Sequence, residues 1–234
     1  AKGGTLSPQD FVTVIILSVG LIAPLVTLMS YSDDLRTMGT TFGEVQKILD
    51  APEMDRPETG DAPEDNSLRL KDVRFSYADK EILHGVSMDI PEGSFVALVG
   101  PSGSGKSTIA RLIASLWDVN SGSISLGGKD IREIPQEAWA DRVAFVSQDN
   151  YLFNMTVREN IRLGRPGATD KEVEEAAKQS GCHDFITLLV NGYDTIVGSS
   201  GGHLSGGERQ RISIARAMLK AAPIVILDEA TAYT

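Results

Sequence analysis

A glycine-rich segment, GPSGSGKST at residues 100–108, constrains the fold of this 234-residue sequence more than any other feature. The apolar run from Phe95 to Val99 comes directly before it and is expected to form a short buried strand. A helix is expected after it, through residues 111–113. The spacing G-x-x-x-x-G-K-S between a strand and a helix is typical of a loop that binds phosphate groups. An alternative reading, a glycine-rich turn without a ligand, does not explain this order of elements.

Each residue type in this loop suits a contact with phosphate. Glycine lets the backbone wrap closely around a phosphate chain, a lysine can reach the terminal phosphates, and a serine hydroxyl can ligate Mg²⁺. The N-terminus of the following helix points at the same anion. The residues expected to bind the nucleotide here are Gly100, Ser102, Gly103, Ser104, Gly105, Lys106, Ser107 and Thr108, with Ser107 also a metal ligand.

Two further apolar runs, at residues 142–147 and 224–227, are candidate strands of the same sheet. Proteins with such a loop are built on a largely parallel sheet flanked by helices, so the fold class expected is α/β. The second run leads into Asp228 and Glu229. A carboxylate at the end of a neighbouring strand holds Mg²⁺ in these proteins, which is the role expected for Asp228. Glu229 would polarise the attacking water, unless it is only an acidic residue beside the metal.

The composition is that of an ordinary globular protein, with 41% hydrophobic and 23% charged residues. A net charge of -10 argues against a general nucleic-acid binder, because such proteins present an excess of Lys and Arg. Cys182 is the only cysteine, so an internal disulfide is excluded. The three histidines, which are His84, His183 and His203, are too scattered to indicate a metal site.

An uncharged stretch from Phe11 to Ser32 is expected to form a membrane-spanning helix. Its 22 residues would extend about 33 Å as a helix, enough to cross a bilayer. A signal peptide and a buried core helix are the alternatives. Pro24 lies inside the stretch and would free a backbone carbonyl and kink the helix, which membrane helices tolerate.

The polar segment that follows divides the chain. Apolar residues recur at three- and four-residue steps from Asp33 to Leu49 and predict that the helix continues out of the membrane. Residues 50–65 are acidic and rich in proline and predict an extended, solvated linker. We therefore expect the end of a transmembrane domain at residues 1–49, with its membrane helix at about 11–32, and a nucleotide-binding domain at 66–234.

A second glycine-containing motif, LSGGERQRISIARAML, occupies residues 204–219. Ser205 and Glu208 have the spacing of a capping box at the start of a helix with an apolar stripe. A capped helix alone does not explain Gly206 and Gly207, because glycines in a first turn cost helix stability unless something must approach the backbone closely. A phosphate would be such a ligand.

With this motif the sequence resembles the ATP-binding cassette (ABC) family, whose signature is LSGGQ and whose ATPases work as head-to-tail dimers. The resemblance covers about residues 66–234. It implies a P-loop NTPase fold of the ABC type, with an antiparallel β subdomain and a helical signature subdomain. It also implies that Ser205, Gly206 and Gly207 contact the γ-phosphate of ATP on the partner subunit, which is either an identical or a different chain. Glu208 stands where the signature has Gln, a common variation.

The resemblance assigns further residues. Gln148, in VSQDN, matches the glutamine that senses Mg²⁺ and the transport domain, which makes it a catalytic and metal-binding candidate beside Lys106 and Glu229. Tyr77, in RFSYADKEIL, matches the aromatic residue that stacks on adenine. The segment from Gln148 to Ile161 would receive short helices of the membrane domain. The pattern SSGGH at residues 199–203 departs from the exporter-type branch of the family, which commonly has an acidic residue and another loop pattern there.

Finer features, NGYDTIVG and LFNMTVRENI, resemble the exporter-type branch, in which membrane helices and ATPase share one polypeptide. The family continues beyond the position of Glu229 with a D-loop aspartate and a switch histidine, and an exporter half has about six membrane helices. The sequence is therefore expected to be an internal piece of a half-transporter, and to be poorly active alone.

The function expected is that of an ATP-hydrolysing subunit that couples ATP binding, dimerisation and hydrolysis to transport across a membrane, with ATP and Mg²⁺ as its ligands. Its partners would be a second ABC subunit, further transmembrane helices and an unidentified substrate, without nucleic acid. The complete protein would be a multi-pass protein of the cell membrane with a cytoplasmic nucleotide-binding domain. A soluble ABC ATPase and a non-catalytic nucleotide-binding module are the alternatives. The sequence leaves the transport direction open.

Overall fold

The computed structural model describes residues 7–51, 54–60, 63–198 and 204–228. The chain separates into two compact units, Ala1–Glu53 and Met54–Thr234. Glu229 lies outside the described residues, as does the pattern at 199–203.

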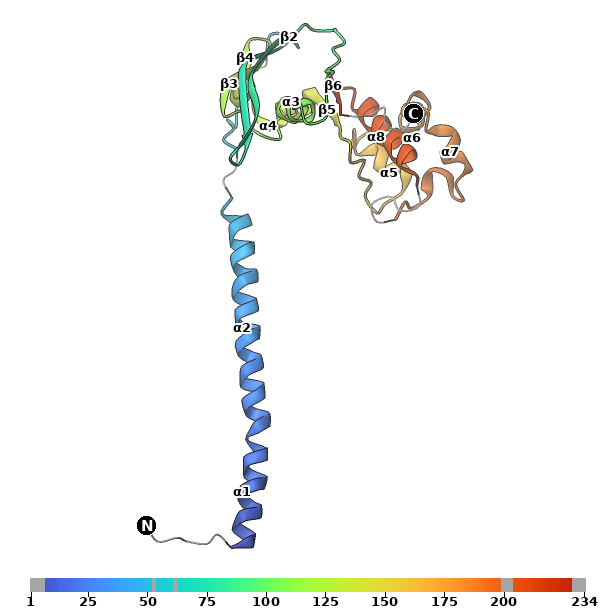
Figure 1. Ribbon diagram of the computed structural model, residues 1–234. Helices are drawn as coiled ribbons and strands as arrows, with labels where there is room; N and C mark the ends of the chain where they lie inside the picture. The colour runs from blue at the N-terminus through green and yellow to red at the C-terminus, as the bar shows by residue number, and fades with distance from the viewer. Residues whose placement is uncertain (1–6, 52–53, 61–62, 199–203, 229–234) are drawn as a thin grey trace. The chain divides into compact units, whose positions relative to one another are not determined.

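The first unit is one long helical segment with a break near its start. Helix α1 (Pro8–Gly20) and helix α2 (Ile22–Leu49) meet at Leu21 (Figure 1). Pro24 explains this break, because it has no N–H to offer the carbonyl of Gly20 four residues earlier. The expectation that the helix continues through the polar segment is confirmed, since α2 ends at Leu49.

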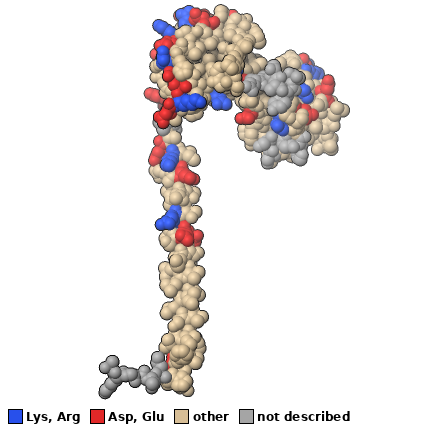
Figure 2. Space-filling model, viewed as in Figure 1, with Lys and Arg blue, Asp and Glu red and all other residues tan. Residues whose placement is uncertain are grey.

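Among the described residues, Pro8–Leu49 is long and apolar enough to cross a membrane. None of the residues of α1 or α2 is buried. Figure 2 shows a long uncharged part of this segment, followed by turns of α2 that carry both acidic and basic side chains. The apolar surface of the helix therefore has no protein covering within its own unit.

The second unit begins with a four-stranded antiparallel sheet in the order β2-β1-β3-β4. Its strands are β1 (Leu68–Tyr77), β2 (Lys80–Ile90), β3 (Ser121–Leu126) and β4 (Lys129–Asp130) (Figure 1). Strands β1 and β2 form a hairpin in which Phe75 is opposite Leu83. The antiparallel β subdomain implied by the resemblance is confirmed.

Alternate residues of β1 point into a core shared with three helical elements. These are α3 (Lys106–Ile113), the 3-10 turn η1 (Ile131–Glu133) and α4 (Gln136–Arg142). Burial of apolar side chains supplies most of the driving force for such packing. The best-buried members of this core are Leu70, Val73, Leu83, Leu112, Ile124, Leu126, Ile134 and Trp139.

A small parallel sheet joins β5 (Val143–Val146) to β6 (Ile224–Leu227). Both strands were predicted from their apolar runs, and both predictions are confirmed. Ala144 and Val146 pack against Ala217 of the last helix and against Ala222. Small side chains on both sides let the helix approach the strand closely.

The prediction of a buried strand from Phe95 to Val99 is wrong. The segment is irregular, and both end residues are 93% exposed. An apolar run indicates burial, but a strand also needs a neighbour for its backbone hydrogen bonds, and β5 and β6 pair with each other. No strand of the described residues pairs with 95–99.

The remaining elements form a helical group (Figure 1). They are α5 (Val157–Arg162), α6 (Asp170–Gln179), α7 (His183–Leu188), the 3-10 turn η2 (Gly192–Asp194) and α8 (Gly206–Lys220). Helices α5 and α6 both pack against α8. The apolar stripe predicted for α8 is confirmed, because Ile212, Ala215 and Leu219 are buried in this group.

A partly buried polar network ties α8 to the segment after β5. The Arg216 guanidinium donates to the carbonyl oxygens of Asn160, at 2.9 Å, and Tyr151, at 3.4 Å. The side chain of Asn160 in turn accepts from the backbone N–H of Phe153 at 2.9 Å. Burial lowers the pKa of Arg216 from its ordinary value, because desolvation disfavours the charged form.

Part of the acidic segment expected to be a solvated linker belongs to the second unit and packs within it. Arg56 is buried and forms an ion pair with Asp118. Residues 64 and 65 lie so close to Gly127 that a Cβ there would be 2.7 Å from the backbone nitrogen of Asp65. The sequence did not identify the partners in this packing.

Candidate phosphate-binding site

The loop at residues 100–108 adopts a backbone that requires glycine. Gly105 precedes α3 in the left-handed region, with φ of 90°. A Cβ at Gly105 would lie 2.6 Å from Cδ2 of Leu83 on β2. Gly103 also has positive φ, at 79°. The loop can therefore lie closely over the hairpin and present backbone N–H groups at the start of α3.

Lys106 and Ser107 form the first turn of α3 and face different partners. The ammonium of Lys106 donates to the carbonyl oxygens of Gly100 and Pro101, both at 3.0 Å. This bends the lysine back over the loop. The Ser107 hydroxyl donates to a carboxylate oxygen of Asp228 at 2.7 Å, although the two residues are 121 positions apart.

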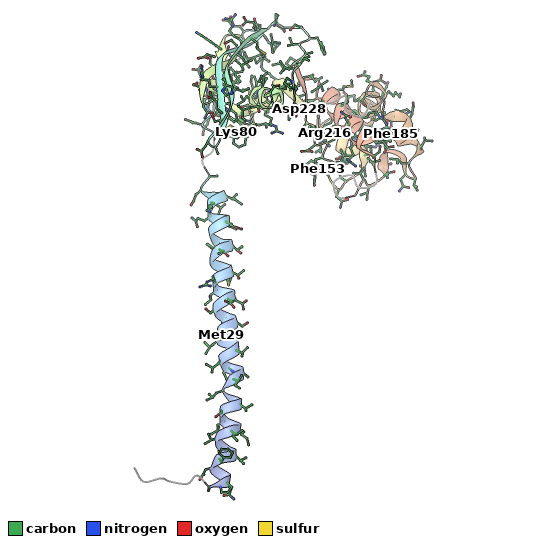
Figure 3. All side chains as sticks on the ribbon, viewed as in Figure 1. Met29, Lys80, Phe153, Phe185, Arg216 and Asp228 are labelled. Carbon is green, nitrogen blue, oxygen red and sulfur yellow. The ribbon has the colours of Figure 1, made fainter. Side chains whose placement is uncertain are left out.

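Asp228 follows β6 and is buried (Figure 3). Its backbone N–H donates to the carbonyl of Val146, the last residue of β5, at 2.9 Å. Gln148 follows the same strand two residues later, is exposed, and accepts a hydrogen bond from Asn150 through its backbone carbonyl. Because β5 and β6 are parallel, Asp228 and Gln148 belong to the same edge of the sheet.

The remaining loop residues predicted to bind phosphate lie in and beside the same turn. Ser104 donates its backbone N–H to Pro101 at 3.3 Å, Ser102 is exposed, and Thr108 is buried inside α3. The structure therefore brings the predicted residues of the loop, at the N-terminus of α3, close to Asp228, at the C-terminal end of β6.

Tyr77 lies at the end of β1 in an aromatic group that we call the aromatic cluster, formed by Phe75, Tyr77 and Trp117. The rings of Tyr77 and Phe75 meet edge to face at 4.8 Å, and those of Tyr77 and Trp117 at 5.6 Å. The Tyr77 hydroxyl is buried and has no hydrogen-bond partner among the described residues. Trp117 was not among the site residues predicted from the sequence. The available signal was a large aromatic residue directly before the charged Asp118.

The signature residues stand at a different element, the N-terminus of α8. Ser205 is the N-cap, and Gly206 and Gly207 are the first two helical residues. The predicted capping box is confirmed: the Ser205 hydroxyl accepts from the Glu208 N–H, and the Glu208 carboxylate accepts from the Ser205 N–H at 2.7 Å. These hydrogen bonds of Ser205 stay within its own helix.

Replacing Glu208 with Gln is expected to change the acid stability of the chain. The Ser205 N–H and hydroxyl, helped by Arg211, hold the pKa of Glu208 below its ordinary value. A depressed folded-state pKa stabilises the fold at neutral pH, and this contribution disappears as the pH falls below about 4. At pH 7 the free energy of unfolding of the variant should be at most about 1 kcal/mol below that of the wild type. When the pH is lowered, the variant should lose less of its unfolding free energy than the wild type does.

Urea unfolding at neutral and acidic pH measures this difference. Glu137→Gln, on the exposed first turn of α4, is the matched control. Equal acid sensitivity of the Glu208→Gln variant and the wild type would contradict the prediction.

The oxygen atoms of Ser107 and Asp228 suit a hard cation. Hydroxyl and carboxylate oxygens are ligands that Mg²⁺ prefers, and Mg²⁺ is usually held by one or two protein groups together with substrate phosphates. Within the part of the chain that the structure describes, no group of three or more His, Cys, Asp or Glu side chains could hold a metal. The residues present therefore fit a metal that arrives with a phosphate ligand.

The fold and this loop define a P-loop protein that binds nucleotides. Comparison with protein families matches residues 83–232 to the model described as ABC transporter. The chain belongs to the ABC transporter family and carries its ATP-binding domain.

Several curated proteins are similar in sequence to this chain. It is 50% identical over 165 residues to an uncharacterized ABC transporter ATP-binding protein, y4gM, of Sinorhizobium fredii, covering 70% of this chain and 28% of that protein. It is 40% identical over 231 residues to the ATP-dependent lipid A-core flippase of Desulfotalea psychrophila, covering 97% of this chain and 40% of the flippase. It is also 40% identical to the mycobactin import ATP-binding/permease protein IrtB of Mycolicibacterium thermoresistibile, with the same two coverages.

A solved structure, that of a bacterial Atm1-family ABC exporter with ATP bound, matches with a TM-score of 0.75 and 40% sequence identity. The match covers 100% of this chain and 41% of the exporter chain. The chain thus spans less than half the length of these relatives. Its fold is that of an ABC ATPase preceded by a long apolar helix, as the sequence predicted.

Proposed function

We propose that this chain binds ATP with Mg²⁺ and hydrolyses it, and that a transporter containing it uses this reaction to move a substrate across a membrane. The observation that carries the proposal is the 2.7 Å hydrogen bond from Ser107 to Asp228. It joins the phosphate-binding loop to Asp228, which follows β6 and precedes Glu229 in the sequence, and an ATPase needs these parts side by side.

In the proposed mechanism the backbone N–H groups of residues 100–108 hold the phosphates, and Lys106 turns from its two carbonyl partners to the terminal phosphate. Ser107, Asp228 and Gln148 would hold Mg²⁺, which neutralises charge on the phosphate oxygens when bound. Glu229 would orient a water molecule for in-line attack on the γ-phosphorus. The bond to the bridging oxygen then breaks, which gives ADP and phosphate.

The proposed assembly is a head-to-tail dimer, in which Ser205, Gly206 and Gly207 contact ATP on the partner subunit. The support is geometric, because these residues begin a capped 15-residue helix whose N-terminus suits an anion. We propose α1 and the first part of α2 as a membrane span in a cell membrane, residues 50–65 as the connection, and residues 66–234 as the cytoplasmic nucleotide-binding domain. The names of the relatives include both a flippase and an importer, so the proposal names no substrate.

Replacing Lys106 with Met tests this function. Methionine keeps the apolar stem but removes the charge, so the variant should bind ATP about 10- to 100-fold more weakly, as expected for hydrogen bonds to a charged group. Isothermal titration calorimetry of the complete chain in detergent, with ATP and Mg²⁺, measures the affinity.

The matched control is Lys80→Met, an exposed lysine at the start of β2 (Figure 3). The control should bind ATP as the wild type does. Equal affinities of the Lys106→Met variant and the wild type, or a wild-type chain that does not bind ATP, would refute the proposed function.

A further inference from the structure

Arg56 is a buried cation in a segment where a solvated chain was expected. Residues 50–67 carry seven acidic side chains and this single arginine. Its side chain is only 6% exposed. Burying an arginine costs free energy unless its donors are paired, and here both terminal nitrogens have partners, whereas Nε has none among the described residues.

Apart from its chain neighbours Met54 and Asp55, the partners of Arg56 lie directly after the phosphate-binding helix α3. Its two terminal nitrogens donate to the two carboxylate oxygens of Asp118, at 2.6 and 3.0 Å. One of them also donates to the Ser115 hydroxyl at 3.0 Å. The two parallel bonds to one carboxylate fix direction as well as distance, which a lysine could not do.

Ser115 stands at a strained point of the backbone. It ends α3 in the left-handed region, with φ of 56°, where glycine is usually found. The backbone N–H of Ser115 donates to Leu112, and that of Leu116 donates to Arg111, which is the hydrogen-bond pattern of a Schellman motif. The Arg56 guanidinium therefore holds the side chain of the residue at which the chain turns away from α3.

That turn leads directly to the aromatic cluster. Trp117, adjacent to Asp118, is half exposed, and its ring lies 5.6 Å from that of Tyr77 and 6.2 Å from that of Phe75. Further along the chain, the side chain of Asn120 accepts from the backbone N–H of Ser76, the residue before Tyr77, at 2.6 Å. Residues 115–120 are thus fastened by Arg56 at one end and by β1 at the other.

We propose that Arg56 is a positioning residue of the nucleotide site: by holding Ser115 and Asp118 it keeps Trp117 against Tyr77 and so sets the affinity for the adenine base. This inference rests on the proposed function and on the role that the family resemblance implies for Tyr77, which is stacking on adenine. It connects the segment after α2 to the base, whereas the phosphates are held by the loop at residues 100–108.

The test compares two ligands, ATP and inorganic tripolyphosphate, on the complete chain in detergent. Stacking of a base on an aromatic side chain contributes enough that partial loss should weaken ATP binding roughly five- to tenfold in Arg56→Met. Tripolyphosphate has no base, so its affinity should not change. Asp118→Asn, which removes the charge on the other side of the pair, should weaken ATP binding in the same selective way.

Acrylamide quenching of tryptophan fluorescence supplies a second readout. The chain has two tryptophans, and Trp139 is buried, so the accessible signal comes from Trp117. Quenching should increase in Arg56→Met. The control is Arg69→Met, which breaks an exposed ion pair with Asp89 on the same sheet and should change neither quenching nor binding.

Three results would overturn the inference. Unchanged ATP affinity in both variants would show that Arg56 does not influence the base, and equal loss for both ligands would assign it a general structural role. If Arg56→Met does not fold, Asp118→Asn decides between these results. A wild-type chain that binds tripolyphosphate but not ATP would remove adenine recognition altogether, whereas one that binds neither ligand would refute the proposed function and this inference together.

Discussion

A chain in which Glu229 is replaced by Gln is expected to bind ATP as tightly as the wild type and to hydrolyse it at least about 100-fold more slowly. Asp228 is fixed through Ser107 and Val146, and Glu229 follows it directly in the sequence. Glutamine keeps the size and a hydrogen-bonding oxygen but lacks the negative charge that orients and polarises water. Binding and chemistry should therefore separate in this variant.

Phosphate release under single-turnover conditions, with the chain in excess over labelled ATP, measures the rate even where activity is low. Glu137→Gln, an exposed carboxylate on α4, is the control and should hydrolyse ATP at the wild-type rate. Undiminished turnover in Glu229→Gln would refute its role. ATP binding without any turnover in the wild type would favour the alternative of a non-catalytic nucleotide-binding module.

Replacement of Gly164 by Ala should cost about 3 kcal/mol or more of unfolding free energy. Gly164 lies just after α5, where the chain passes α8. A Cβ at this position would be 2.1 Å from the carbonyl oxygen of Arg216 and 3.3 Å from the backbone nitrogen of Lys220. Both atoms belong to helical backbone, which cannot move aside as a flexible side chain can, so α5 and α8 would have to separate.

Gly167, three residues later, is a matched control because a Cβ there would meet no atom within 4 Å. Gly167→Ala should be neutral or stabilise the chain by up to about 1 kcal/mol, since alanine lowers the entropy of the unfolded state. Chemical unfolding followed by far-ultraviolet circular dichroism compares the two variants. Similar stabilities of the Gly164→Ala and Gly167→Ala chains would contradict the steric argument.

Local patterns predicted the features whose cause is local. The helix after the phosphate-binding loop, the capping box of Ser205 and Glu208, and the strands that became β5 and β6 each follow from residues within a few positions of one another. The break near Pro24 in the long N-terminal helical segment has the same origin. In each case the signal lies within the element it predicts or within a few positions of it.

Features that depend on distant partners were missed or wrongly predicted. The run from Phe95 to Val99 has the composition of a strand, but composition does not specify which backbone will pair with it. Arg56 pairs with Asp118, 62 positions away, and Gly164 is needed because of Arg216. The lone arginine in an acidic segment was a visible signal of the first contact, but it did not identify the partner.

The network around Arg216 also limits which residues can occupy that position. Its bonds to the carbonyls of Asn160 and Tyr151 use separate nitrogens of one planar group. Lysine would carry the same charge into the same partly buried place, with its donors gathered on a single nitrogen. A lysine at this position would still pay the cost of desolvation but would lose part of the hydrogen bonding that offsets it. Keeping the charge would therefore not be enough to keep the stability of the fold. The tolerance of α8 to substitution is therefore set at this point by side-chain geometry rather than by charge.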